Sequence, residues 1–324
     1  MYSFEQLYQI FSEELGKQNF TKNPKELYEP IVYTLSQSGK RLRPIFTLMA
    51  CDLFGGDIYK SIPQALAIEL LHNFTLIHDD IMDEAPLRHG QETVHTRWNQ
   101  KLAILAGDTL YALAYRYVMQ SNIESLPAIL ETFNNTALEA CEGQQMDINF
   151  ENLDVVSKDD YILMSNYKTA ALFGASMCIG AIIGEAPEED VELLSLYGRN
   201  LGMAFQLRDD LLDLYGEQKD FGKKTGLDII ENKKTYLFVA AMERADNETK
   251  KQLWSCYHDP QVGPEKKIAK VKAIFDRLNI ETVTNEAIES YVNKSLESLE
   301  KVNRPKEDKV ILEKLAKQMV SRKK

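Results

Sequence analysis

Residues 67–83, "AIELLHNFTLIHDDIMD", place three aspartates, Asp79, Asp80 and Asp83, at the end of a strongly apolar stretch. Apolar residues recur there at intervals of three and four, which predicts a helix with a buried face. Carboxylates at this spacing share a face and oppose helix formation by roughly a few tenths of a kcal/mol per pair. Because an unpaired buried ion costs on the order of several kcal/mol, the cluster requires a positive partner or water.

The chain repeats this pattern in "FQLRDDLLDLYG", residues 205–216, where Asp209, Asp210 and Asp213 have the same spacing. Carboxylates suit Mg²⁺, which keeps several waters and often bridges to substrate phosphates. A calcium loop needs alternating acids, a central glycine and a distal Glu, which this stretch lacks, and zinc would favour His or Cys ligands over a set of carboxylates. The alternative is a solvated acidic face, which two clusters in apolar surroundings disfavour. The sequence therefore predicts a magnesium site.

Helical periodicity extends over nearly the whole chain of 324 residues, and two-residue alternation is hard to find. Sparse glycine and proline, 16 and 10 residues, also suit long helices with few turns. We expect an all-α protein with one domain over residues 1–324, because no linker is long enough to divide it. One helix should begin near Arg41 and end at residues 55–57, and another should run from Pro187 to Gly216.

The net charge is −11 and the sequence has no strong basic stripe, so nucleic acid is not expected as a partner. The most apolar run, residues 169–184, is shorter than the roughly 20 residues that cross a bilayer, which predicts a buried helix and no membrane insertion. The N-terminal stretch lacks the basic start and apolar core of a signal peptide. None of the four cysteines lies in a CxxC pair. These features together favour a cytoplasmic protein.

Basic residues recur at loops and expected helix starts between and around the two clusters. They lie in "SGKRLRP" (38–44), "PLRHG" (86–90), "NYKTAA" (166–171), "FGKKTG" (221–226) and "ENKKTY" (231–236). Each segment alone could be an ordinary solvated turn. Together they supply the cations that, with magnesium-bound carboxylates, form a diphosphate site.

With these motifs in this order, and with "GQQMD" between the clusters, the chain resembles trans-isoprenyl diphosphate synthases of the polyprenyl synthetase family, of the short-chain farnesyl or geranylgeranyl type. The resemblance covers nearly the whole chain. It implies a bundle of long, mostly antiparallel helices around a deep central cavity. It also implies a homodimer whose small-molecule partners are diphosphate substrates.

The resemblance further implies roles for individual residues. Asp79, Asp80 and Asp83 would hold two Mg²⁺ ions, and Asp209, with Asp210 and Asp213 nearby, would hold a third; Mn²⁺ is an alternative ion. Lys168, Thr169, Gln206 and Lys223 would act in catalysis. The substrate-binding residues would be Lys40, Arg43, His72, Arg88, His89 and Lys233, while Gln144 and Asp147 would support the second cluster.

The implied activity joins isopentenyl diphosphate head-to-tail to an allylic diphosphate, giving a C15–C20 product. A class I terpene cyclase is disfavoured, because "RDDLLD" and "GKRLRP" are not expected in one. A metal-dependent phosphohydrolase could use His72, His78 and Asp79. Such an enzyme needs further ligands scattered along the chain, and this sequence does not supply them. A non-catalytic regulatory subunit would lack some aspartates, and all six are present.

His89 departs from the pair of arginines that the family has before the glycine. Histidine is positive only below about pH 6.5 when unperturbed, and it lacks the guanidinium fork. We predict weak binding of isopentenyl diphosphate that strengthens at mildly acid pH. His89→Arg should lower the KM for this substrate in steady-state assays, and an unchanged KM would contradict the interpretation.

Phe74 and Thr75 lie about one helical turn before Asp79, where family resemblance implies the floor of the product cavity. The ring of Phe74 would stop the growing chain, whereas Thr75 would leave room beside it. Phe74→Ala should therefore give longer products, measured by chromatography of the dephosphorylated alcohols. An unchanged distribution of chain lengths would refute the assignment of Phe74, whose alternative role is ordinary core packing.

Overall fold

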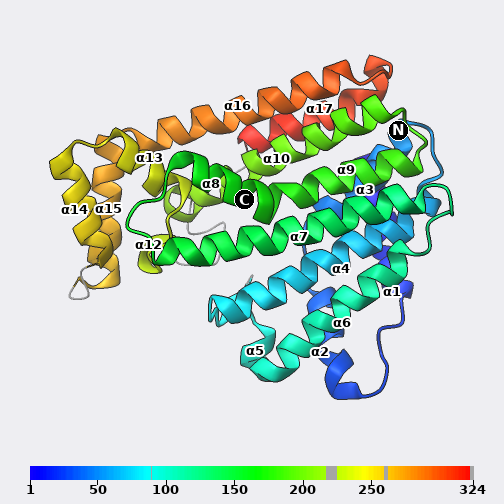
Figure 1. Cartoon of the computed structure of the whole chain (residues 1–324), viewed down its shortest axis with the longest axis horizontal. Helices are drawn as coiled ribbons and strands as arrows, with labels where there is room; N and C mark the ends of the chain where they lie inside the picture. Colours follow the sequence, from blue (N-terminus) through cyan, green and yellow to red (C-terminus); the bar gives the residue numbers. More distant parts are fainter. Residues whose placement is uncertain (89, 217–224, 259–261, 322–324) are drawn as a thin grey trace.

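The computed structural model describes residues 1–88, 90–216, 225–258 and 262–321, and it confirms the all-α prediction. Long helices lie roughly side by side along the long axis of the molecule (Figure 1). The helices are α1 (Phe4–Lys17), α2 (Lys25–Ser36), α3 (Leu42–Leu53), α4 (Ile58–Met82), α5 (Val94–Arg97), α6 (Gln100–Val118), α7 (Leu126–Glu151), α8 (Lys158–Ser165), the π-helix η1 (Asn166–Ala170), α9 (Ala171–Ile183), α10 (Glu188–Tyr215), α12 (Leu227–Ile230), α13 (Tyr236–Arg244), α14 (Asn247–His258), α15 (Pro264–Arg277), α16 (Ile280–Lys301) and α17 (Lys306–Ser321).

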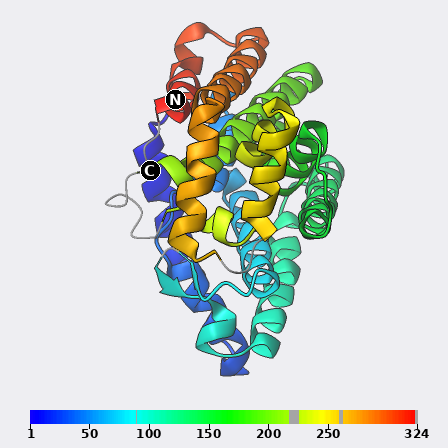
Figure 2. The same cartoon turned by 90° about the vertical axis from the view of Figure 1, so that its left-hand side faces the viewer.

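A two-strand antiparallel hairpin, β1 (Leu87–Arg88) and β2 (Gln91–Glu92), makes up the sheet of the described residues. It follows the end of α4. Figure 2 shows α14 and α15 closing the end of the bundle that lies on the left of Figure 1. The two helices predicted around residues 41–57 and 187–216 are confirmed as α3 and α10.

The acidic clusters occupy the C-terminal turns of α4 and α10. Asp57 starts α4 by accepting a hydrogen bond from the backbone of Tyr59, and the helix ends at Met82. The C-terminus of a helix carries partial negative charge, so carboxylates there are disfavoured by about 0.3–1 kcal/mol each at exposed positions. The stability of the helices therefore does not explain why both α4 and α10 carry aspartates at their C-terminal ends.

The apolar run at residues 169–184 forms α9, which packs between α3 and α10 in the core. Small residues allow this approach. A Cβ on Gly180 would lie 2.1 Å from the backbone oxygen of Thr47 in α3, and one on Gly198 would lie 2.5 Å from the oxygen of Phe173. These contacts fix the distance between the helix that follows residues 38–41 and the helix that carries the second cluster.

Gly180→Ala should lower the free energy of unfolding by about 1–3 kcal/mol, because an overpacked core must shift its backbone. Thermal and denaturant melts measure the change. Gly16→Ala in α1 is the matched control, since the added Cβ meets no atom within 4 Å among the described residues and α-helices favour alanine over glycine. Equal stability of the two variants would contradict the close contact of α3 and α9.

Candidate active site

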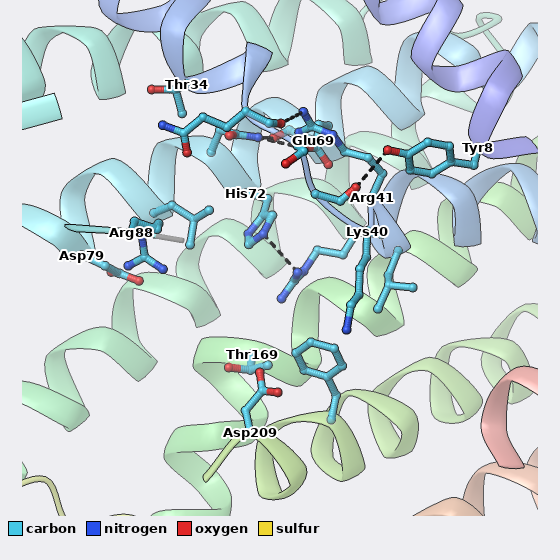
Figure 3. A pocket seen from close by; sticks show the side chains of 18 of the residues that line it. Tyr8, Thr34, Lys40, Arg41, Glu69, His72, Asp79, Arg88, Thr169 and Asp209 are labelled. Carbon is cyan, nitrogen blue, oxygen red and sulfur yellow. Dashed lines mark hydrogen bonds and ion pairs between the residues drawn. The ribbon is translucent and has the colours of Figure 1, made fainter. Parts of the chain in front are cut away.

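A pocket of about 1100 Å³ is lined by residues of α1, α2, α3, α4, α5, η1, α10 and α17, with the loop before α3 and the hairpin region. The predicted site residues on its wall are Lys40, Arg43, His72, Asp79, Asp80, Asp83, Arg88, Lys168, Thr169, Gln206 and Asp209. Figure 3 shows Lys40 and His72 on one side of this space and Thr169 and Asp209 on another. The fold thus brings together residues that lie as far apart as 40 and 209 in the chain.

The first acidic cluster lies among cations. Arg88 Nε donates to Asp80 Oδ1 over 2.7 Å, and Lys233 Nζ donates to Asp83 Oδ2 over 3.4 Å. Burial raises the pKa of Asp79 to about 6, and the nearby Lys168 and Arg88 only partly offset this effect. A carboxyl with such a pKa lacks the positive charge that would fully stabilise its ionised form.

The second cluster divides into two parts. Asp209 lines the pocket, whereas Asp210 and Asp213 are absent from its described lining. Asp210 accepts hydrogen bonds from the Tyr161 hydroxyl at 2.5 Å and the Tyr236 backbone at 2.9 Å. These bonds join α10 to α8 and α13, which indicates a structural function for Asp210.

Asp213 is also tied to a neighbouring segment. Its carboxylate accepts from the backbone nitrogens of Leu227 and Asp228, each at 3.2 Å, at the start of α12. An acid at a helix N-terminus satisfies donors that have no partner within the helix. Asp213 therefore holds in place the segment that leads to Lys233.

The π-helix η1 carries Lys168 and Thr169. Lys168 Nζ donates to Asp147 Oδ2 over 2.6 Å. Burial would lower the pKa of Lys168, but the carboxylates of Asp147 and Asp79 outweigh it and hold the pKa above its ordinary value. Thr169 donates to Gln206 Oε1 over 2.8 Å, and Gln206 Nε2 donates to Asp210 over 2.8 Å. The lysine thus remains charged, and the amide of Gln206 has a fixed orientation.

The cationic side of the pocket contains Arg43 and His72. Arg43 Nη1 lies 3.1 Å from His72 Nε2, and since a guanidinium only donates, Nε2 accepts and the ring proton of neutral His72 lies on Nδ1. Arg43 also stacks on the Phe173 ring at 4.5 Å, and burial lowers its pKa to about 10, so it stays charged near neutral pH. Its buried Nε has no hydrogen-bond partner among the described residues. Such a cation is suited to bind an anion.

Several predicted residues lie elsewhere. His89 and Lys223 fall outside the described residues. Phe74 packs on His78 and Tyr111, with ring centroids 4.8 and 5.0 Å away, and is not part of the described pocket lining, so its role as a floor stays a prediction. Thr75 is also absent from that lining, and its hydroxyl donates to the His72 backbone.

Gln144 and Asp147 were expected to support the second cluster. Asp147 lies near Tyr161, which donates to Asp210, so that support stays a prediction, and the structure also shows contacts of both residues near the first cluster. Gln144 Nε2 lies 3.7 Å from the sulfur of Met82, at the end of α4. Asp147 pairs with Lys168 and raises the pKa of Asp79 further. Helix α7 therefore faces the first cluster through these residues, which spacing along the chain could not reveal.

Comparison with known proteins shows the family of the chain. A model of the polyprenyl synthetase family matches residues 24–278. The chain belongs to this family. It is 37% identical over 303 residues to the geranylgeranyl diphosphate synthase of Methanosarcina mazei, covering 92% of this chain and 90% of the relative. It is 41% identical over 246 residues to the short chain isoprenyl diphosphate synthase of Methanocaldococcus jannaschii, covering 76% and 74%.

A solved geranylgeranyl pyrophosphate synthase superposes with a TM-score of 0.94 over all of both chains, at 40% identity. The predictions of the family and of an enzyme that transfers prenyl groups are therefore confirmed. Within the part of the chain that the structure describes, no helix has the length and apolar character needed to span a bilayer.

Proposed function

We propose that this chain is a Mg²⁺-dependent head-to-tail prenyltransferase. It condenses isopentenyl diphosphate with dimethylallyl, geranyl or farnesyl diphosphate, giving a C15–C20 trans-polyprenyl diphosphate and diphosphate. The observation that carries the proposal is a single pocket with Asp79, Asp83 and Asp209 on its wall together with Lys40 and Arg43. Such a pocket can hold one diphosphate through metal ions and another through cations.

The donor set fits magnesium. Among the described residues, no three His, Cys, Asp or Glu side chains come together closely enough to hold a metal ion by themselves. Mg²⁺ does not require this, because one or two carboxylates, waters and substrate phosphates complete its shell. Burial raises the pKa of Asp79 to about 6, and a cation bound beside it would favour its ionised form. Asp79, Asp80, Asp83 and Asp209 would hold the ions.

When bound, Mg²⁺ stabilises negative charge that grows on the diphosphate as its bond to the allylic carbon breaks. Arg88 and Lys168 contribute positive charge at the same place, with Lys233 nearby. Arg88 now pairs with Asp80, and Lys233 pairs with Asp83. If Asp80 and Asp83 held metal ions instead, both cations would be available to the substrate.

The allylic cation needs polar oxygens near it and no water. The hydroxyl oxygen of Thr169 retains lone pairs after donating to Gln206, so it can face the positive carbon. Leu76, Ile77 and Phe205 supply apolar wall that excludes water. The double bond of isopentenyl diphosphate then attacks the allylic carbon and forms the new C–C bond. The cation that results loses a proton to the released diphosphate, which restores a double bond.

Isopentenyl diphosphate would bind on the side of Lys40, Arg43 and His72. Charged donors there bind phosphate oxygens without a metal ion. We also propose that residues 1–324 form one domain and work as a homodimer, as the family resemblance implies. The relatives named as geranylgeranyl synthases favour a C20 product within the proposed range.

Incubation of the purified chain with Mg²⁺, isopentenyl diphosphate and each allylic diphosphate tests this function. We predict elongated diphosphates, loss of product with EDTA and recovery with added Mg²⁺. Asp79→Asn should lower kcat by at least about 100-fold, since it removes part of the stabilisation of the leaving group. The exposed Asp108→Asn, on α6, is the control and should retain the rate.

Hydrocarbon products would instead indicate a cyclase, and free phosphate would indicate a hydrolase. Absence of product with every primer would favour a regulatory subunit. Each of these outcomes contradicts the proposal.

A further inference from the structure

The loop that carries Lys40 into the pocket turns on a residue in an unusual conformation. Arg41 precedes α3 with φ of +48° and ψ of 34°, in the left-handed region that side chains other than glycine disfavour. A non-glycine residue persists there only when its surroundings hold it. The contacts of the Arg41 side chain provide that hold.

Both terminal nitrogens of Arg41 have partners within the protein. Nη1 pairs with the carboxylate of Glu69, while Nη2 donates to the backbone oxygens of Leu35 at 2.8 Å and Gln37 at 2.7 Å, at the end of α2. The guanidinium therefore satisfies carbonyls that a helix C-terminus leaves open. Although Arg41 lines the pocket, these groups are already engaged within the protein.

Glu69 is equally fixed. It is 2% exposed and accepts a hydrogen bond from Asn73 Nδ2 at 3.0 Å, while the same amide donates to the Glu69 backbone oxygen at 2.7 Å. A buried carboxylate with these two partners cannot turn away without leaving a charged guanidinium unpaired. Figure 3 shows Arg41 and Glu69 together at the side of the pocket from which Lys40 extends.

We propose that Arg41 and Glu69 form a clamp that positions Lys40, Arg43 and His72 and thereby sets the affinity for isopentenyl diphosphate. This inference rests on the proposed function. Glu69 lies one turn before His72 on α4, and Arg41 lies between Lys40 and Arg43 in the chain. The clamp thus joins the loop to the same helix that Arg43 contacts through His72. Arg41 and Glu69 are positioning residues, because they act through these three.

Arg41→Gly separates the side-chain contacts from the backbone conformation, since glycine adopts positive φ without strain. We expect the KM for isopentenyl diphosphate to rise about tenfold, because small displacements of binding groups are costly. The KM for the allylic substrate and kcat should stay within about twofold. Calorimetric titration with isopentenyl diphosphate alone should show the same loss of affinity.

Glu69→Gln keeps the shape of the side chain and removes its charge, so it should also raise the KM for isopentenyl diphosphate. This variant tests the clamp independently if Arg41→Gly folds poorly. The double variant should lose little more than either single variant, because both break one interaction. Asp190→Asn is the control: Asp190 is buried and accepts from the Asn303 backbone at 2.8 Å, and it is not part of the described lining of the active-site pocket. It should leave both KM values unchanged.

Unchanged affinity for isopentenyl diphosphate in either folded clamp variant would overturn the inference. So would an equal loss of affinity for both substrates, because that result indicates general damage. If wild type condenses the substrates and the clamp variants behave like wild type, only the clamp is refuted. If wild type forms no elongated product, the proposed function fails and the clamp fails with it.

Discussion

Carboxylates at the C-terminal ends of α4 and α10 impose the main constraint on this structure. They lie where the helix dipole disfavours negative charge, and burial raises the pKa of Asp79 and of Asp210 to about 6. The positive charges near the first cluster come from Arg88 just after α4 and from two segments farther along the chain, Lys168 on η1 and Lys233 after α12. This charge balance is what a diphosphate and its metal ions would exploit.

The two clusters share a spacing but differ in their surroundings. In the first, Asp79, Asp80 and Asp83 all line the pocket. In the second, Asp209 alone of the three lies on the described pocket wall, while Asp210 and Asp213 bind hydroxyl and backbone donors of α8, α12 and α13. The second pattern thus combines one residue available to a ligand with two that hold the site together.

Much of this arrangement follows from the sequence, because helical periodicity and the spacing of acids are local properties. The limits of α3 and α10 and the burial of α9 agree with the predictions made from it. Lys40, Lys168 and Asp209 line one pocket, while their roles there stay predictions. The structural bonds of Asp210 could not be predicted, since Tyr161 and Tyr236 approach it only after folding. The pairing of Arg41 with Glu69 could not be predicted either. The sequence shows only that both residues are charged and that Glu69 lies in an apolar stretch.

A crystal structure with Mg²⁺ and inorganic diphosphate tests the central claim most directly. The account predicts metal ions bound by Asp79, Asp80, Asp83 and Asp209, with the anion between them and Arg88 and Lys168. It would be contradicted by a structure in which Arg88 and Lys233 keep their present aspartate partners, no metal ion lies beside either cluster, and the diphosphate binds elsewhere.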